Sequence, residues 1–178
     1  MRVIAGTARG VRLESPSGSK VRPTLDRVRE SLFSILGESV LDVGFLDLFA
    51  GTGAVGIEAL SRGAAQAVFV DSSVNHLALV QRNLAKTKLG ARARTVRCSL
   101  PDRVHVIGGT FEIIYADPPR MFADYQTLLD GIQSAGLLAE SGRIILETTS
   151  KRPLADELGG YAAVDRRMYG ETQLTIFT

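Results

Sequence analysis

Acidic side chains stand in or directly after apolar runs at three places in this chain, one shortly before a glycine pattern and one directly before two prolines. Asp47 is followed by the pattern G-T-G-A-V-G at 51–56. Asp71 follows A-V-F-V, and Asp117 begins the sequence Asp-Pro-Pro. Glycine lets a backbone approach a bound molecule closely, and a carboxylate accepts hydrogen bonds from hydroxyl or amino groups. These three places together predict a binding site for a polar small molecule.

The glycine pattern alone fits more than one explanation. Gly51-x-Gly53-x-x-Gly56, with Asp71 20 residues after Gly51, matches the dinucleotide-binding fingerprint, although glycines after a strand also form plain tight turns. A pyrophosphate favours positive potential at the helix N-terminus, which the Asp47 carboxylate opposes. A cofactor that carries an ammonium or sulfonium group and no phosphate gains from that carboxylate. We therefore expect S-adenosylmethionine here, with Asp71 on its ribose hydroxyls.

Asp117-Pro118-Pro119 favours chemistry on an amino group. The two prolines fix the backbone and remove two N–H donors, so the Asp117 carboxylate and the loop carbonyls form a rigid row of acceptors. Such a row can hold the hydrogens of an amino group while its lone pair faces a methyl donor. The same three residues could also be a plain end to a strand. Beside the Asp47 glycine loop, we expect them to be catalytic.

Strands and helices alternate after residue 43. Strands are expected at 44–50, 67–70, 93–98, 111–116 and 143–147, with a closing pair at 161–168 and 173–177. Helices are expected at 55–60, 74–89 and 125–135. This alternation predicts an α/β fold with a doubly wound, mostly parallel sheet and a C-terminal antiparallel hairpin. Ligands bind at the carboxyl ends of such strands, where all three motifs fall.

An N-terminal addition is expected before this sheet. Residues 1–20 contain turn signals between short extended pieces, and a helical pattern runs from Thr24, a candidate N-cap, to Gly37. We place the boundary between this addition, residues 1–40, and the main domain, residues 41–178.

Composition excludes several classes of protein. The chain has 178 residues, 45% of them apolar, which suits one soluble, cytoplasmic globular protein. A single cysteine excludes a disulfide framework, and the apolar runs are too short for a membrane span. His76 and His105 lack partners at metal-ligand spacing, so no metal site is expected.

The net charge of +2 hides an uneven distribution. Residues 1–29 carry seven basic and two acidic side chains, and residues 82–103 carry seven basic and one acidic. Neutralisation of phosphates drives binding to nucleic acids, so the first block is expected to form an RNA surface. The second block fits either a solvated face or an accessory RNA contact.

D-L-F-A-G-T-G at 47–53 with D-P-P at 117–119 resembles the class I S-adenosylmethionine-dependent methyltransferases that modify exocyclic amino groups. R-x-I-A-G-x-x-R-G at 2–10, R-P-T-x-D-R-V-R-E at 22–30 and Y-G-x-T-x-L at 169–174 make the chain similar to the bacterial 16S ribosomal RNA guanine-N(2) methyltransferases. The resemblance implies a Rossmann-like fold, an RNA-facing β-hairpin and helix at 1–40, and a methyltransferase domain at 41–178.

The resemblance and the motifs together give three sets of site residues. The catalytic set is Asp117, Pro118 and Pro119. The cofactor-binding set is Asp47, Ala50, Gly51, Thr52, Gly53, Asp71 and Ser99. The RNA-binding set is Arg9, Arg22, Thr24, Arg27, Arg29, Arg120 and Phe122.

Three positions depart from the family pattern. Arg120 stands where an aromatic residue would stack on the extruded base, a role that either the arginine plane or Phe122 could take. Ser99 replaces the Asp or Asn that would contact the adenine amino group of the cofactor. Ser34 replaces an asparagine after Leu32-Phe33.

The resulting hypothesis is methyl transfer from S-adenosylmethionine to the 2-amino group of a guanine in 16S rRNA, either free or in the assembling small ribosomal subunit. We expect a monomer without a membrane partner. The alternatives are another amino acceptor (adenine or protein glutamine), a non-catalytic RNA-binding relative, and an NAD-linked oxidoreductase that uses the same glycines.

Overall fold

The computed structural model describes residues 1–16 and 23–178. The helices are α1 (Pro23–Leu36), α2 (Ala54–Arg62), α3 (Val74–Thr87) and α4 (Tyr125–Ser134). The strands are β1 (Gly44–Leu48), β2 (Gln66–Asp71), β3 (Ala93–Arg97), β4 (Phe111–Ala116), β5 (Leu138–Thr149), β6 (Glu157–Leu158), β7 (Tyr161–Tyr169) and β8 (Thr172–Phe177). Short 3-10 turns span Gly37–Val40, Gly90–Arg92 and Val104–Val106.

Within the described residues the strands form one sheet in the order β3-β2-β1-β4-β5-β8-β7-β6. The first five in this order pair in parallel, and β5–β8, β8–β7 and β7–β6 pair antiparallel. This confirms the predicted α/β fold with its C-terminal antiparallel part. The strand order reverses between β1 and β4, and a crevice at such a reversal is where open α/β sheets bind ligands.

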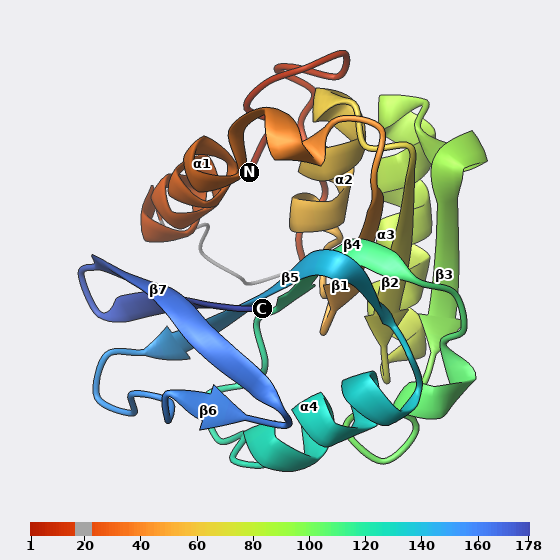
Figure 1. Ribbon diagram of the computed structural model, residues 1–178. Helices are drawn as coiled ribbons and strands as arrows, with labels where there is room; N and C mark the ends of the chain where they lie inside the picture. The colour runs from red at the N-terminus through yellow and green to blue at the C-terminus, as the bar shows by residue number, and fades with distance from the viewer. Residues whose placement is uncertain (17–22) are drawn as a thin grey trace.

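Helices cover both faces of the sheet, as Figure 1 shows. Apolar residues of α1, α2 and α3 pack on one face, in a core that includes Leu32, Ile57 and Val80. On the other face α4 packs through residues such as Leu128 and Ile132. Because both faces are covered, the central strands consist of continuous apolar runs, and every residue of β1 is buried.

The N-terminal segment is a hairpin fastened to α2. The Val3 N–H donates to the Val11 carbonyl at 3.0 Å, and the Gly10 N–H donates back to Val3 at 2.9 Å. The buried Glu58 carboxylate accepts the N–H groups of Ile4 and Ala5 at 2.8 and 2.9 Å. Residues 1–13 thus form a hairpin held by an isolated antiparallel bridge between Arg2 and Arg12, and this hairpin shares the core with α1 and α2. The division at residue 40 and the RNA-facing role stay predictions.

Several boundaries differ from the sequence prediction. Helix α1 begins at Pro23, whose fixed φ suits a first helical position, so Thr24 lies inside the first turn rather than at the N-cap. Strand β1 ends at Leu48 instead of Ala50 because Phe49 adopts a φ of 60°. Strand β5 begins five residues earlier than the predicted Arg143, across a register shift against β4.

No helix in residues 1–16 and 23–178 combines the length and the apolar character that a membrane crossing requires.

Candidate active site

A cavity of about 270 Å³ lies at the carboxyl ends of β1, β4 and β5. Its walls include the glycine loop after β1, Asp117 after β4 and Glu147 near the end of β5. Asp47 and Tyr115, which are neighbours on adjacent strands, form part of the same wall. The structure therefore brings the glycine motif and the Asp-Pro-Pro motif to one cavity at the point where the strand order reverses.

The glycine loop is shaped by backbone conformations that suit glycine. Gly51 and Gly53 have positive φ values of 55° and 74°, and α2 begins immediately after Gly53. A Cβ at Gly56 would lie 2.4 Å from the Phe69 ring, so only glycine lets α2 pack this closely against β2. A Cβ at Gly51 would meet nothing nearer than the Phe49 carbonyl oxygen at 3.9 Å, which leaves the cavity side of the loop open.

Asp47 is 2% exposed and contacts the first turn of α2, directly after the glycine loop. Its Oδ2 accepts the Gly56 N–H at 2.9 Å. Burial raises the pKa of Asp47 to about 8, with a further contribution from the neighbouring Asp71, while the Gly56 hydrogen bond acts in the opposite direction. A buried carboxylate with so little compensation would gain from a cationic group in the cavity.

Asp71 fixes the loop from the next strand. Its Oδ2 accepts the Gly51 N–H at 2.9 Å, and its Oδ1 accepts the Ser73 N–H at 2.8 Å. His76 Nδ1 lies 3.1 Å from Oδ2, a partner that the sequence analysis missed. A carboxylate offers about four acceptor positions, so Asp71 keeps capacity for a ligand hydroxyl.

Three acidic or phenolic groups meet on the β4–β5 side of the cavity. The Tyr115 hydroxyl donates to Glu147 Oε2 at 2.5 Å. Leu146 pairs with Ala116 across the two strands, which puts Glu147 beside Asp117. Burial, followed by the charges of Glu147 and Asp47, raises the pKa of Asp117 to about 8 although solvent still reaches its side chain. Burial also raises the pKa of Glu147.

The chain matches, over residues 1–178, the protein family described as conserved hypothetical protein 95. YlbH of Bacillus subtilis (strain 168), named as a candidate rRNA methyltransferase, is 34% identical over 99% of this chain and 98% of its own length. Ribosomal RNA small subunit methyltransferase D of Escherichia coli (strain K12) is 31% identical over 99% of this chain and 89% of its own length.

A solved structure from Escherichia coli, described as the candidate methyltransferase yhhF, has a TM-score of 0.87 and 32% identity. The match covers 99% of this chain and 96% of that one. This chain belongs to the ribosomal RNA small subunit methyltransferase D family. Membership confirms the resemblance found in the sequence, the Rossmann-like fold and the enzyme class, an RNA methyltransferase.

One residue expected to face RNA is placed differently in this family member. Arg29 is 4% exposed and lines the cavity, and its Nη2 donates to the Arg2 carbonyl at 2.7 Å. Its Nε lies 3.7 Å from Glu58 Oε2. This burial has a physical cause, because the face of α1 that packs on the sheet is the face that carries Arg29. Periodicity alone did not assign an arginine to that face.

The other RNA-binding residues expected in the first 40 positions fall into two groups. Arg9 and Arg27 are exposed, on the hairpin and on α1. Arg22 lies outside the described residues, and only the backbone of Thr24 is described.

The loop after Pro119 contains both residues expected to stack on the base, Arg120 and Phe122, and the structure places them in different surroundings. The Phe122 N–H donates to the Pro119 carbonyl at 2.8 Å, and the Phe122 ring contacts Phe49 with centroids 5.2 Å apart. Phe49 in turn lines the cavity. Phe122 thus joins Phe49 in an aromatic surface beside the cavity, whereas Arg120 faces solvent.

Ser99 is exposed and stands outside the lining of this cavity. Gly53 and Asp71 also stand outside the lining, but Gly53 belongs to the glycine loop and Asp71 contacts that loop through Gly51, which does line the cavity. The structure therefore brings Asp47, Ala50, Gly51, Thr52 and Asp117 together, and it leaves Ser99 apart.

Sequence reasoning missed Glu147 and did not assign Tyr115 to a site. A usable signal was present, since Glu147 ends the run R-I-I-L-E just as Asp71 and Asp117 follow apolar runs. The hydroxyl of Tyr115 gave no such signal, because its position depends on the packing between β4 and β5.

The second basic block is largely bound within the chain. Arg82 and Lys86 contact the Glu14 carboxylate at 2.8 and 2.7 Å. Arg92 donates to the carbonyls of Leu60 and Ala64, and other members cap carbonyls nearby. These contacts give the block a structural role, which neither the solvated-face interpretation nor the accessory RNA contact had assigned to it.

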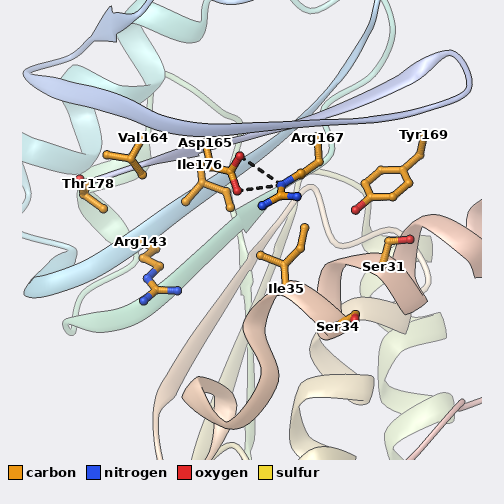
Figure 2. Close-up of a pocket in the computed structure, with 10 residues that line it drawn as sticks. All are labelled: Ser31, Ser34, Ile35, Arg143, Val164, Asp165, Arg167, Tyr169, Ile176 and Thr178. Carbon is orange, nitrogen blue, oxygen red and sulfur yellow. Dashed lines mark hydrogen bonds and ion pairs between the residues drawn. The ribbon is translucent and has the colours of Figure 1, made fainter.

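A larger cavity of about 670 Å³ lies between α1 and the β7–β8 strands. Figure 2 shows its residues, among them Asp165, which pairs with Arg167 at 2.9 Å. It contains neither the glycine loop nor the Asp-Pro-Pro carboxylate. The smaller cavity is therefore the candidate active site.

Proposed function

We propose that this protein transfers a methyl group from S-adenosylmethionine to the exocyclic 2-amino group of a guanine in 16S rRNA, free or in an assembling small subunit. The observation that supports this most directly is the position of Asp117. It follows β4 in a loop stiffened by two prolines and lines the same cavity as the glycine loop. Within the described residues its carboxylate has no hydrogen-bond partner, so its acceptors are available to an amino group.

The cavity fits the cofactor by charge. Asp47 would offset a positive charge on the methionine part, and Arg29, which is basic and lines the same cavity, suits its carboxylate. Asp71 would bind the ribose hydroxyls, with Ala50, Gly51, Thr52 and Gly53 against the remaining surface. When bound, S-adenosylmethionine supplies a methyl group on a positively charged sulfur, which leaves as a neutral thioether.

Asp117 then acts on the acceptor nitrogen. Its carboxylate and the adjacent loop carbonyls accept the two amino hydrogens and turn the nitrogen lone pair toward the methyl group. Once the N–C bond has formed the nitrogen is positive, and it loses a proton to Asp117 or to water. Pro118 and Pro119 hold the loop so that this alignment needs no rearrangement.

The RNA would approach from the hairpin and α1, through Arg9 and Arg27. A guanine must leave its stack to reach the cavity. Phe122, backed by Phe49, suits the face of the extruded base, and Arg120 suits a neighbouring phosphate. Arg22 and Thr24 belong to the same proposal through the family pattern. We further propose that the protein acts as a monomer in the cytoplasm.

Replacement of Asp117 tests this function. We expect Asp117→Ala to reduce methyl transfer to undermethylated small subunits by about 10³-fold, because the amino group loses its alignment. S-adenosylmethionine affinity, measured by calorimetry, should change less than about threefold. Asp117→Asn keeps one acceptor oxygen and should retain part of the activity.

Nucleoside analysis of the product identifies the modified atom. N2-methylguanine supports the proposal, whereas a methylated adenine or glutamine would assign another acceptor. RNA binding without methyl transfer would indicate a non-catalytic relative, and tight binding of NAD without S-adenosylmethionine binding would indicate an oxidoreductase. Undiminished activity of Asp117→Ala would contradict the role of the Asp-Pro-Pro loop.

A further inference from the structure

Glu147 is a buried carboxylate at the cavity that neither cofactor binding nor the Asp117 step explains. It is 9% exposed and lines the cavity close to the end of β5. Its Oε2 accepts the Tyr115 hydroxyl, while Oε1 has no hydrogen-bond partner among the described residues. Glu147 thus keeps one acceptor oxygen open at the cavity, and this position favours a ligand that brings a hydrogen-bond donor.

The position of Glu147 relative to Asp117 narrows the choice of donor. The β4–β5 register, with Leu146 opposite Ala116, places Glu147 of β5 beside Asp117, the first residue after β4. Neighbouring strands lie about 4.8 Å apart, so the two acceptors can serve adjacent donors of a single flat group. Guanine offers such a pair at its Watson–Crick edge, in the N1–H and the 2-amino group. Adenine offers an acceptor at N1, which a carboxylate would repel.

We propose that Glu147 determines base specificity by accepting the N1–H of the target guanine through Oε1. This inference rests on the proposed function, because Asp117 holds the 2-amino group next to N1.

Tyr115 is the positioning residue for this contact. Its hydroxyl donates to Oε2 from the neighbouring strand, which fixes the carboxylate plane and leaves Oε1 for the base. The Tyr115 hydroxyl keeps its proton and so remains the donor, because burial and the charge of Glu147 raise the pKa of Tyr115 well above its ordinary value. The Tyr115→Phe variant should loosen the carboxylate without removing it.

RNA with guanine or 2,6-diaminopurine at the target position tests the proposal directly. Both bases carry the 2-amino group, but diaminopurine has an acceptor at N1. We expect wild-type kcat/KM to be about 10–100-fold higher for guanine, the effect of one well-formed base contact. In Glu147→Gln the amide can rotate to donate to N1, so the preference should fall below about fivefold. Tyr115→Phe should give an intermediate preference.

Glu140→Gln serves as the matched control, since Glu140 is exposed on the same strand. It should keep the wild-type preference. A wild-type enzyme that methylates both bases equally would overturn the proposal without any variant, and so would an unchanged preference in a folded Glu147→Gln protein. If Glu147→Gln instead weakens S-adenosylmethionine binding more than about tenfold and keeps its preference, Glu147 contacts the cofactor and the proposal is wrong.

Failure of the underlying function gives a different result. In that case wild-type enzyme leaves the 2-amino group of guanine unmodified in any RNA, and no base preference can be measured.

Discussion

The two sides of the active-site cavity use their acidic residues differently. On the β1–β2 side, Asp47 and Asp71 each accept backbone N–H groups from the glycine loop or the start of the following helix. On the β4–β5 side, Asp117 and Glu147 lie side by side, and within the described residues the Tyr115 hydroxyl is the hydrogen-bond donor between them. On the first side each acidic residue already accepts at least one backbone N–H in the free protein, and the second side has open acceptors.

The difference follows from the backbone that each side provides. A glycine loop entering a helix directs several N–H groups inward, and carboxylates bind them readily. A loop with two prolines has lost those donors. The cofactor side is thus built before any ligand arrives, whereas the acceptor side depends on the donors that its substrate brings. Three predictions test this comparison, and a fourth, with the smallest effects, compares the two basic blocks.

Removal of the Asp71 carboxylate should lower both the stability of the glycine loop and the affinity for S-adenosylmethionine. In Asp71→Ala the N–H groups of Gly51 and Ser73 lose their acceptor, which costs about 1–3 kcal/mol of stability. The loss of the ribose contact should weaken S-adenosylmethionine binding roughly 30-fold, measured by calorimetry. Asp71→Asn keeps an acceptor and should lie between. Wild-type affinity in Asp71→Ala would show that this carboxylate serves only the fold.

The pH dependence of activity tests whether the Asp117 carboxylate, on the side with open acceptors, binds the amino group. The pKa of Asp117 is raised to about 8, so its carboxyl is protonated below that pH and cannot accept both amino hydrogens. We expect kcat/KM to rise about tenfold per pH unit up to pH 8 and then to level off. Asp117→Asn has no such proton and should show a flat profile over this range. A wild-type profile that is flat from pH 6 to 8 would contradict the assignment.

Replacing Asp47 by a neutral residue should raise the stability of the protein and weaken cofactor binding. Its folded-state pKa of about 8 lies above the ordinary value of 3.8, so the folded protein holds a proton that the unfolded chain has lost between these pH values. Stability therefore falls as pH rises through this window. Asp47→Asn should remove that loss and raise stability at pH 8 by about 2 kcal/mol, or roughly 4–8 °C in melting temperature.

The same variant should bind S-adenosylmethionine more weakly, because it no longer offsets a positive charge. Thermal unfolding at pH 5 and pH 8 gives the comparison, since the gain should be smaller at pH 5. A variant less stable than wild type at pH 8 would show that the negative charge is stabilising.

The two basic blocks provide the smallest effects. Arg27→Ala removes an exposed cation from α1 and should weaken RNA binding a few-fold while lowering its salt slope by about 1. Arg92→Ala removes two hydrogen bonds to carbonyls at the end of α2 and should cost about 1 kcal/mol without changing RNA binding. Filter binding over a salt series distinguishes them, and a reduced slope in Arg92→Ala would restore the second block as an RNA contact.

Much of the fold and part of the site were predictable from local sequence. The limits of β4, the start of α3 and the strand-end positions of Asp71 and Asp117 follow from apolar periodicity and from the glycines and prolines that interrupt it. The length of β5 was not predictable, because its first residues include Glu140 and Gly142 and join the sheet only by pairing with β4 across a register shift.

The contacts of charged residues were the least predictable from the sequence. Glu14 pairs with Arg82, 68 positions away, and Arg29 enters the cavity instead of facing solvent. Neither arrangement is visible in the distribution of charge along the chain.

The sequence by itself determined the alternating elements and the chemistry at their ends, because turns, caps and apolar periods depend on neighbouring residues. Only the tertiary structure decided which of those ends face one cavity. Strand β4 lies between β1 and β5, and this order brings Asp47, Asp117 and Glu147 together from positions 70 and 30 residues apart in the chain. Long-range strand pairing therefore turns separate acidic residues into one site.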